Sequence, residues 1–397
     1  MRSSSSSSVL ASLPNARLRR PAVWIAFLAV ATLSLTGCDL FGSNDDDALP
    51  VDPDVVIGNS GPGVDAADGS LTLYNRANST AAPYNIEVGF INSLTLHDDR
   101  LFVVDNTGPA SGRITTFGDD QLQPLGQFSN PRAPRRIAFP TQNKGYVPNL
   151  SLFDDETFVP DTSTVSVLDL QNNSVTKQID VGRSPEGIAV VSGKAFVANS
   201  ADGTLSVLDT EADTATSTLS LEGCPSPKSV FVDGEDEVTV VCQGSAERSS
   251  EVLFLNSNEE EIASRVELGA PVGSANATQS AYYSEEAEEL YAVSGVETLG
   301  RGELPGTGEI FRVNTNANTL DATLEVPQDD GLVNITAVGY DDVNQNLYVT
   351  RLPVGPDDGP DFEANGAAIV LDREGNQVTR FETGIAPAHI IFLRDQQ

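Results

Sequence analysis

The sequence contains few basic residues and very few histidines, cysteines and tryptophans. Its 397 residues include 23 Lys and Arg against 57 Asp and Glu. A surface of this charge repels nucleic acid and anionic membrane surfaces, so nucleic acid is not expected as a partner. His97 and His389 are the only histidines, and two isolated imidazoles make neither a zinc site nor a recognisable catalytic triad.

Long apolar runs are also scarce, and the longest, Ala22–Leu35, follows three arginines between residues 17 and 20. This pattern predicts a secretory signal over residues 1–37. The following "LTGC" resembles the bacterial lipobox, which implies that Cys38 is acylated and anchors the chain to a membrane. An uncleaved spanning anchor is the alternative, for which the run is short. We expect an exported lipoprotein on the outer membrane or cell surface, facing outside or the periplasm.

An acidic, turn-rich segment over residues 38–54 is expected to be a flexible tether. Its three aspartates at 45–47 resemble the surface-export signal of Bacteroidetes-type lipoproteins, and a solvated linker is the alternative interpretation. Removing residues 1–37 removes four arginines and no acid, which changes the net charge from −34 to −38. Such charge suits concentrated salt, where self-repulsion is screened, and we expect a halophilic source.

The remainder, residues 55–397, repeats one pattern of short apolar runs separated by tight turns. Seven runs end in or beside Asp, Asn or Gly and share one place in the pattern: "SLTLYN" (70–75), "RITTFG" (113–118), "TVSVLD" (164–169), "TLSVLD" (204–209), "EVLFLN" (251–256), "EIFRVN" (309–314) and "AAIVLD" (367–372). Each of these seven runs is followed by one further apolar run. Six of the seven are also preceded by two apolar runs, which makes four runs per unit. Four strands per unit, repeated every 40 to 59 residues, are typical of β-propeller blades.

The seventh pair is divided between the two ends of this region. Its first strand is "AHIIFL" (388–393) and its second is "VVIGN" (55–59). Neither has a hairpin partner nearby in sequence, so unpaired edges remain unless the two strands meet. We therefore predict an all-β, seven-bladed propeller with four antiparallel strands per blade, closed by pairing of the C-terminal strand with the N-terminal strands.

The most regular unit carries a family resemblance. "FVANSADGTLSVLDTEADTATSTLSLEGCPSP", with "LYVTR" (347–351) and "VGRSPEGIAVV" (181–191), resembles the YVTN-type propeller repeat. The resemblance is strong over residues 160–242 and degenerate elsewhere. It implies a secreted or surface-bound protein with no catalytic role. Similar lipoproteins stand beside TonB-dependent transporters, and some bind cobalamin, which implies nutrient capture as one function.

Long loops predict the binding face. The connections at 150–163, 295–308 and 352–366 all join second to third strands, so they lie on one face of the ring. Candidate ligand-binding residues lie in or near these connections or the connections that lead from the fourth strand of one blade to the first strand of the next. They are Arg135, Arg136, Arg183, Arg351, Phe158, Phe362 and His389. Arginine can hold carboxylate or phosphate, although each arginine can instead pair with a nearby acid. Two acidic stretches, 154–161 and 356–363, lack the spacing of a calcium loop, so no cofactor is expected, with Ca²⁺ as the alternative.

Two cysteines remain after the signal, Cys224 and Cys242. They fall at the same end of one predicted hairpin, and the exported location is oxidising, which favours a disulfide over two buried thiols.

Three functions are compatible with these features. A monomeric, lipid-anchored binding module for a small ligand or a membrane partner explains most of them. A passive acidic surface protein is the second candidate. A lactonase-like or quinoprotein-like enzyme is the third: the first type needs a metal held by acids, and the second often has tryptophan around its cofactor. The only tryptophan here is Trp24, in the signal.

The charge predicts a dependence of stability on salt. The urea-unfolding free energy of the chain lacking residues 1–38 should rise between low salt and about 1 M NaCl, where a Debye length of ~3 Å screens repulsion among the acids. An unfolding free energy that does not rise over this range would contradict the halophilic interpretation.

Overall fold

The structure is a computed structural model of the chain. It describes residues 49–63, 69–108, 111–129, 133–150, 163–244, 248–274, 279–296, 308–328 and 331–393. Within these ranges every regular element is a strand, and no helix is present that could span a membrane. The predicted signal over residues 1–37, Cys38 and most of the tether lie outside the described residues.

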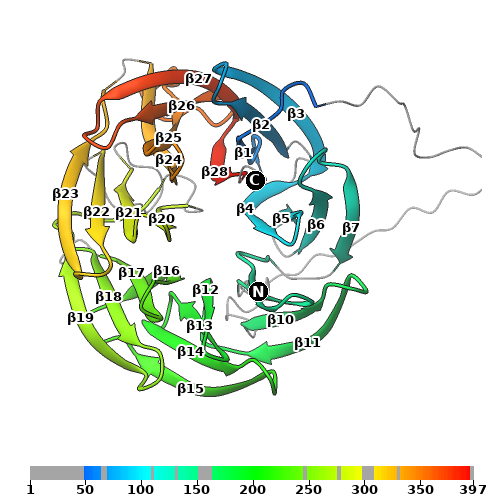
Figure 1. The fold of residues 1–397 in the computed structure, drawn as a ribbon, viewed down its shortest axis with the longest axis vertical. Helices are drawn as coiled ribbons and strands as arrows, with labels where there is room; N and C mark the ends of the chain where they lie inside the picture. The colour runs from blue at the N-terminus through cyan, green and yellow to red at the C-terminus, as the bar shows by residue number, and fades with distance from the viewer. Residues whose placement is uncertain are drawn as a thin grey trace, which may run out of the picture. The chain divides into compact units, whose positions relative to one another are not determined.

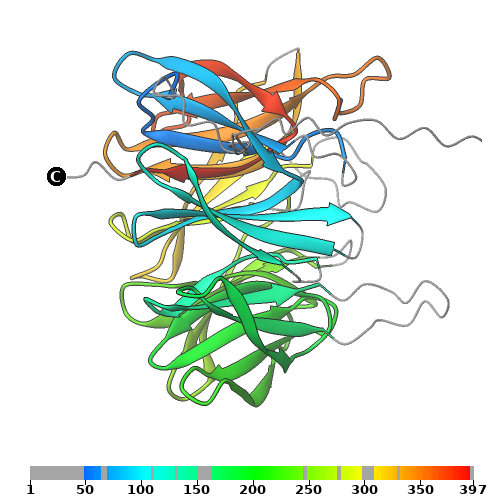
Figure 2. The same cartoon turned by 90° about the vertical axis from the view of Figure 1, so that its right-hand side faces the viewer.

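Seven four-stranded antiparallel sheets stand around a common axis (Figure 1). Figure 2 shows the same ring from the side. We number the blades from the one containing β1 and call their strands a to d from the axis outward. Blade 1 has the order β28-β1-β2-β3, and blades 2 to 7 each use four consecutive strands. The all-β, seven-bladed prediction is confirmed.

The a strands surround the axis, and the b strands follow them. The a strands are β28 (Pro387–Phe392), β4 (Phe90–His97), β8 (Ala138–Thr141), β12 (Pro185–Val191), β16 (Ser226–Val232), β20 (Ala281–Ser284) and β24 (Leu332–Asp341). The b strands are β1 (Val55–Asn59), β5 (Arg100–Gly108), β9 (Lys144–Asn149), β13 (Lys194–Asn199), β17 (Glu237–Gln243), β21 (Glu289–Ser294) and β25 (Asn346–Pro353).

The c and d strands form the outer half of each blade. The c strands are β2 (Gly69–Asn75), β6 (Ser111–Gly118), β10 (Thr164–Asp169), β14 (Thr204–Asp209), β18 (Glu251–Asn256), β22 (Glu309–Asn314) and β26 (Asn365–Leu371). The d strands are β3 (Thr80–Val88), β7 (Pro124–Ser129), β11 (Ser174–Asp180), β15 (Thr214–Ser220), β19 (Glu261–Glu267), β23 (Thr319–Glu325) and β27 (Gln377–Ile385).

The ring closes by pairing of the C-terminal strand with the first one. β28 is antiparallel to β1, with Val56 opposite Ile391 and Ile57 opposite Ile390. The divided blade predicted from residues 55–59 and 388–393 is therefore confirmed. Closure leaves β1 hydrogen-bonded on both sides, which removes the edge that each terminal strand would otherwise expose.

Seven apolar clusters fill the spaces between neighbouring blades. In β13, Phe196 and Ala198 pack toward blade 5, while Ala195 and Val197 pack toward blade 3. Alternation with a period of two thus buries both faces of the strand. Burying a side chain such as Phe196 contributes roughly 2–3 kcal/mol. Outer strands such as β15 are largely exposed and have a polar composition.

One position near the end of strand b is buried in all seven blades, and in six of them its side chain binds another part of the blade. In blades 2 to 7 it lies five residues after the first residue of the strand, and the seven equivalents are Asn59, Asp105, Asn149, Asn199, Cys242, Ser294 and Arg351. None is more than 3% exposed. The asparagine amides each donate to two hydroxyls of strand c, as Asn199 does to Thr204 and Ser206 at 2.9 and 3.0 Å. This is the Asn of the repeated "YVTN"-like run.

The same position also binds the connection that enters its blade. A Cβ on Gly182 would lie 2.5 Å from the Asn199 side chain, so this close approach requires glycine. In blade 2 the Asp105 carboxylate accepts from the Gly89 N–H at 2.6 Å. In blade 5 the tie is covalent, because the structure joins Cys242 to Cys224 by a disulfide with Cα atoms 5.4 Å apart.

Polar contacts link neighbouring blades on the face that carries the a–b and c–d turns. The first residue of strand b binds the c–d turn of the next blade: Lys144 Nζ lies 2.8 Å from Asp213 Oδ1, and Lys194 Nζ lies 2.8 Å from Glu260 Oε1. In blades 5 and 6 this residue is an acid, and the turn supplies the donor. Each such partly exposed pair contributes on the order of 1 kcal/mol or less.

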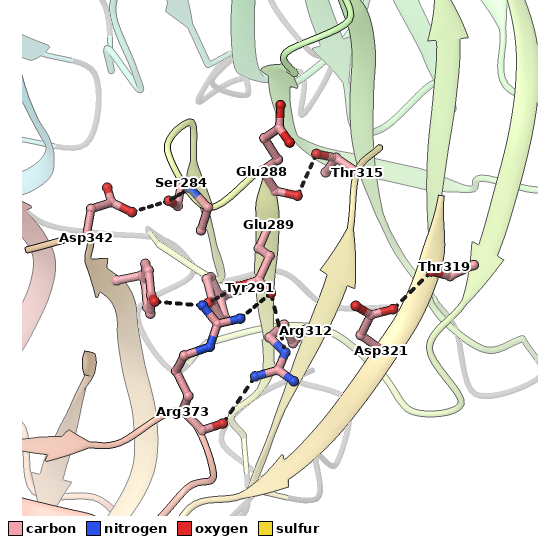
Figure 3. A network of polar contacts seen from close by, with 12 residues as sticks. Ser284, Glu288, Glu289, Tyr291, Arg312, Thr315, Thr319, Asp321, Asp342 and Arg373 are labelled. Carbon is pink, nitrogen blue, oxygen red and sulfur yellow. Dashed lines mark hydrogen bonds and ion pairs between the residues drawn. The ribbon is translucent and has the colours of Figure 1, made fainter. Parts of the chain in front are cut away.

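The most developed of these junctions joins blades 6 and 7 around Glu289 (Figure 3). Its carboxylate accepts from Arg373 at 2.6 Å and from the Tyr291 hydroxyl, and Arg312 lies 3.7 Å away. Arg373 also donates to the Tyr340 hydroxyl at 2.9 Å. Burial, followed by the Glu289 carboxylate, raises the pKa of Tyr291, so the phenol stays a donor.

Asp105 provides a test of the buried tie. Burial raises its pKa from 3.8 to about 6, against the opposing effects of Gly89 and Arg113. The contribution of Asp105 to the free energy of unfolding is therefore most favourable below about pH 4, and it is lost as the pH rises to about 6. Asp105→Asn installs the residue that blades 1, 3 and 4 use. It should raise the unfolding free energy by on the order of 2 kcal/mol above pH 6.

Urea unfolding of both proteins from pH 4 to pH 8 would measure this difference. The advantage of Asp105→Asn should shrink toward pH 4, where both side chains are neutral. An equal difference at every pH would show that the cost of burying this carboxylate is not its cause.

Candidate functional site

A cavity of about 1000 Å³ occupies the axis of the ring. It is lined mainly by the a strands of blades 1, 2, 5 and 6, and all a strands run from the d–a connections toward the a–b turns. Gln279, Arg136 and His389 lie near the beginnings of their strands, and we call these three residues the floor. Exposed aspartates of the a–b and c–d turn face border the opposite end. The large cavity is thus exposed on the face opposite the long b–c loops that the sequence singled out.

The floor is built by hydrogen bonds that converge on the axis. The side-chain amide of Gln279 in blade 6 donates to the Ile390 carbonyl at 3.1 Å, and its oxygen accepts from the Ile390 N–H at 2.7 Å. Because Ile390 belongs to blade 1, this contact reaches past blade 7. Next to the floor lies a second cavity of only about 20 Å³, little more than the space of one water molecule.

Three cations and one carboxylate line this small cavity among the described residues: Arg135, Arg136, Lys228 and Glu186. Glu186 lies 3.5 Å from Arg135 and 3.2 Å from Lys228. Burial pushes the pKa of Glu186 upward, but Arg135, Lys228 and Arg136 together hold it below its usual range. Burial lowers the pKa of Arg136, and Glu186 opposes this effect. The axis is therefore locally positive within a strongly acidic chain.

His389 is the distinctive residue of the floor. It is 5% exposed, and neither ring nitrogen has a hydrogen-bond partner among the described residues. Burial, reinforced by the positive charge of Arg136, lowers the pKa of His389 well below 6.5, so the ring is neutral. A neutral imidazole offers one donor and one acceptor, and a buried polar group left without a partner costs about 1–3 kcal/mol. Both nitrogens are therefore buried with no hydrogen-bond partner among the described residues, beside the cavity that His389 lines.

The walls and the exposed end of the cavity differ in character. Aromatic rings from blades 1, 5 and 6 line it, including Phe392, Phe231 and Tyr282. We call the aspartates at the exposed end the rim; they come from blades 1 and 2 and comprise Asp52, Asp54, Asp98, Asp99, Asp119 and Asp120. His97, at the end of β4, also lines the cavity and stacks on Phe139 with ring centroids 3.8 Å apart.

The predicted ligand-binding residues do not all come together. The cavities bring together Arg135, Arg136 and His389. Arg183, expected at the channel mouth, lines neither cavity; its side chain is 58% exposed and bonds Asp202 at 2.6 Å. Arg351 is buried in the tie position and donates to the Pro327 carbonyl.

Two predicted aromatic residues also lie apart from the cavities or outside the described residues. Phe362 is 37% exposed on the 354–364 loop and lines neither cavity. Phe158 and most of the loops at 150–163 and 295–308 lie outside the described residues. Sequence reasoning missed Gln279, Glu186 and Lys228, whose one signal is that each lies in or just before an a strand.

No group of three or more His, Cys, Asp or Glu side chains within the described ranges is arranged to hold a metal ion. The acidic stretch at 356–363 is described and forms a compact turn, in which the Gly355 N–H donates to the Gly359 carbonyl at 2.7 Å. The other stretch, 154–161, lies outside the described residues.

These features define a seven-bladed β-propeller with an axial cavity. No protein-family model and no curated protein matches the sequence. Among solved structures, the chain is similar to a quinonprotein alcohol dehydrogenase-like protein from Bacteroides thetaiotaomicron, with a TM-score of 0.61 and 12% identity over 86% of this chain and 78% of that one. At these identities, similarity shows the fold alone.

Two other solved structures share the fold at similarly low sequence identity. Kuenenia stuttgartiensis hydrazine synthase aligns with a TM-score of 0.54 and 16% identity over 75% of this chain and 88% of that one. Apo AztD from Citrobacter koseri aligns with a TM-score of 0.50 and 12% identity over 85% and 97%.

The environment of His389 predicts a pH-dependent effect of its replacement. His389→Leu removes two buried polar atoms without partners among the described residues and should raise the unfolding free energy by about 1–2 kcal/mol at pH 8. The wild type keeps His389 neutral when folded but protonates it when unfolded below pH 6.5. The advantage of the variant should therefore grow as the pH falls, by at most about 1.4 kcal/mol per pH unit. Urea unfolding from pH 8 to pH 5 measures this difference between His389→Leu and the wild type. If the difference in unfolding free energy stays constant over this range, His389 is not a buried neutral imidazole.

Proposed function

We propose that this chain is a ligand-binding module and that its axial cavity binds an organic anion with a carboxylate or phosphate group. The observation that carries the proposal is His389, a buried imidazole with no partner among the described residues, which lies at the floor of a large cavity next to Arg136. An anionic oxygen there could accept from the imidazole N–H and lie close to the guanidinium, which is a favourable environment for carboxylate or phosphate.

Binding explains the lining better than catalysis does. Propeller enzymes of the lactonase type need a metal held by acids, and the described lining places its aspartates at the exposed rim rather than at the floor. The floor residues instead offer fixed donors on rigid strands, as binding pockets do. A quinoprotein-like enzyme is the alternative that one structural neighbour favours, because that protein is described as quinonprotein alcohol dehydrogenase-like.

The predicted location gives this binding a biological setting. A lipid anchor at Cys38 and a flexible tether would hold the propeller at the cell surface, where it could capture a nutrient for a TonB-dependent transporter. The resemblance to YVTN-type lipoproteins supports this setting and includes cobalamin-like ligands. A passive acidic surface protein is the competing proposal. The floor of the cavity argues against it, because a passive surface does not need buried polar and charged side chains that converge on an internal cavity.

Calorimetric titration of the chain lacking residues 1–38 tests the binding proposal. The panel is octanoate, phenyl phosphate, cyanocobalamin and 8-aminooctanoate. At least one compound should bind, and Arg136→Gln should weaken its binding at least tenfold, because it removes one charge-assisted contact of about 1.5–3 kcal/mol.

Arg183→Gln is the matched control, since it removes the same charge from an arginine that lines neither cavity. It should leave the affinity unchanged. If no member of the panel binds, or if both variants weaken binding equally, the axial cavity is not the ligand site. A thermal unfolding curve of Arg136→Gln verifies that the variant is folded.

A further inference from the structure

The two ends of the axial cavity carry opposite charges. The floor holds Arg136 and the buried, unpartnered imidazole of His389, whereas the rim consists of six aspartates. Arg76 neutralises one of them in part, because its side chain lies 3.4 Å from Asp54. The remaining rim aspartates are on the a–b and c–d turns of blade 2 and on the chain before β1.

A simple anion fits this arrangement poorly. It would have to approach a positive floor through a negative rim, and the repulsion at the rim would oppose its binding. The small cavity beyond the floor is no alternative route among the described residues, since it has room for little more than a water molecule. A metal cation alone is equally unsuited, because the positive charge of Arg136 at the floor repels it.

We infer that the site takes an elongated zwitterion, with its anionic group at the floor and an ammonium or guanidinium group at the rim. This inference rests on the proposed binding function and specifies its ligand class.

The cavity sets the separation of the two charges. His389 and Leu393 are four residues apart on one extended segment, which spans ~13 Å at about 3.3 Å per residue. The Leu393 N–H donates to the Asp54 carbonyl at 2.9 Å, so the rim begins at that level. The charged groups of the ligand should therefore lie roughly 10 Å apart, with an apolar or aromatic middle between Phe392, Tyr282 and Phe231.

A series of three ligands tests the inference. Calorimetry should show that 8-aminooctanoate, which has both charges at its ends, binds at least tenfold more tightly than octanoate or octylamine. Octanoate keeps only the anionic group, and octylamine keeps only the cationic group. Each of these two compounds forms one opposite-charge pair instead of two, so its binding should include only part of the electrostatic attraction.

A rim variant separates this inference from the function on which it rests. Asp98→Asn/Asp99→Asn keeps the shape of the turn, since asparagine tolerates the positive φ of both positions, 48° and 54°. It should reduce the preference for 8-aminooctanoate over octanoate at least threefold, while octanoate binds as well as before or better. Glu211→Gln/Glu222→Gln is the control: it makes the same charge change on exposed residues of blade 4 that line neither cavity, and the preference should be unchanged.

The outcomes are distinct. If octanoate or octylamine binds as tightly as 8-aminooctanoate, or if the rim variant keeps the full preference, the zwitterion is wrong even where Arg136-dependent binding stands. If none of the three compounds, phenyl phosphate or cyanocobalamin binds in an Arg136-dependent way, the proposed function itself is wrong.

Discussion

The fold depends on one buried position near the end of strand b, which is occupied at the same place in each blade. In six of the seven blades its side chain binds strand c or the connection that enters the blade. Asn199 shows the regular form, and the Cys224–Cys242 disulfide and the Asp105 carboxylate are chemically different solutions to the same requirement. Because a buried donor without a partner is costly, the hydroxyls of strand c stabilise the Asn199 side-chain amide at this position.

Several of the few basic residues lie where blades meet or line the cavities at the axis. Lys144 and Lys194 link neighbouring blades, and Lys228 with Arg135 and Arg136 surrounds Glu186 near the axis. In an acidic chain such cations are strongly attracted to the many available carboxylates. Arg136 lines the large axial cavity, and Arg135 and Lys228 line the small cavity beside it, so positive potential is concentrated next to the buried imidazole of His389.

The most regular repeat lies apart from the floor of the axial cavity. The segment around residues 182–214 is the most regular unit, and its Arg183 lies at an exposed turn away from both cavities. The floor of the axial cavity instead uses the beginnings of a strands in blades 1, 3 and 6, and the regular segment contributes only Glu186 to the small cavity beside it. Gln279 and its partner Ile390 are 111 positions apart in the sequence, and only closure of the ring brings them together.

The number of blades, the limits of most strands and the split blade could be predicted from the sequence, because period-two burial and tight turns are local properties. The sequence also indicated Arg135, Arg136 and His389 as candidates, since each lies near the start of an innermost strand. The arrangement of the blades was needed to show that Arg183, Arg351 and Phe362 lie apart from the cavities, that the large cavity is exposed beside the short turns, and that His389 has no partner among the described residues. Side-chain direction and the contacts across the axis depend on how seven blades meet, which no local pattern encodes.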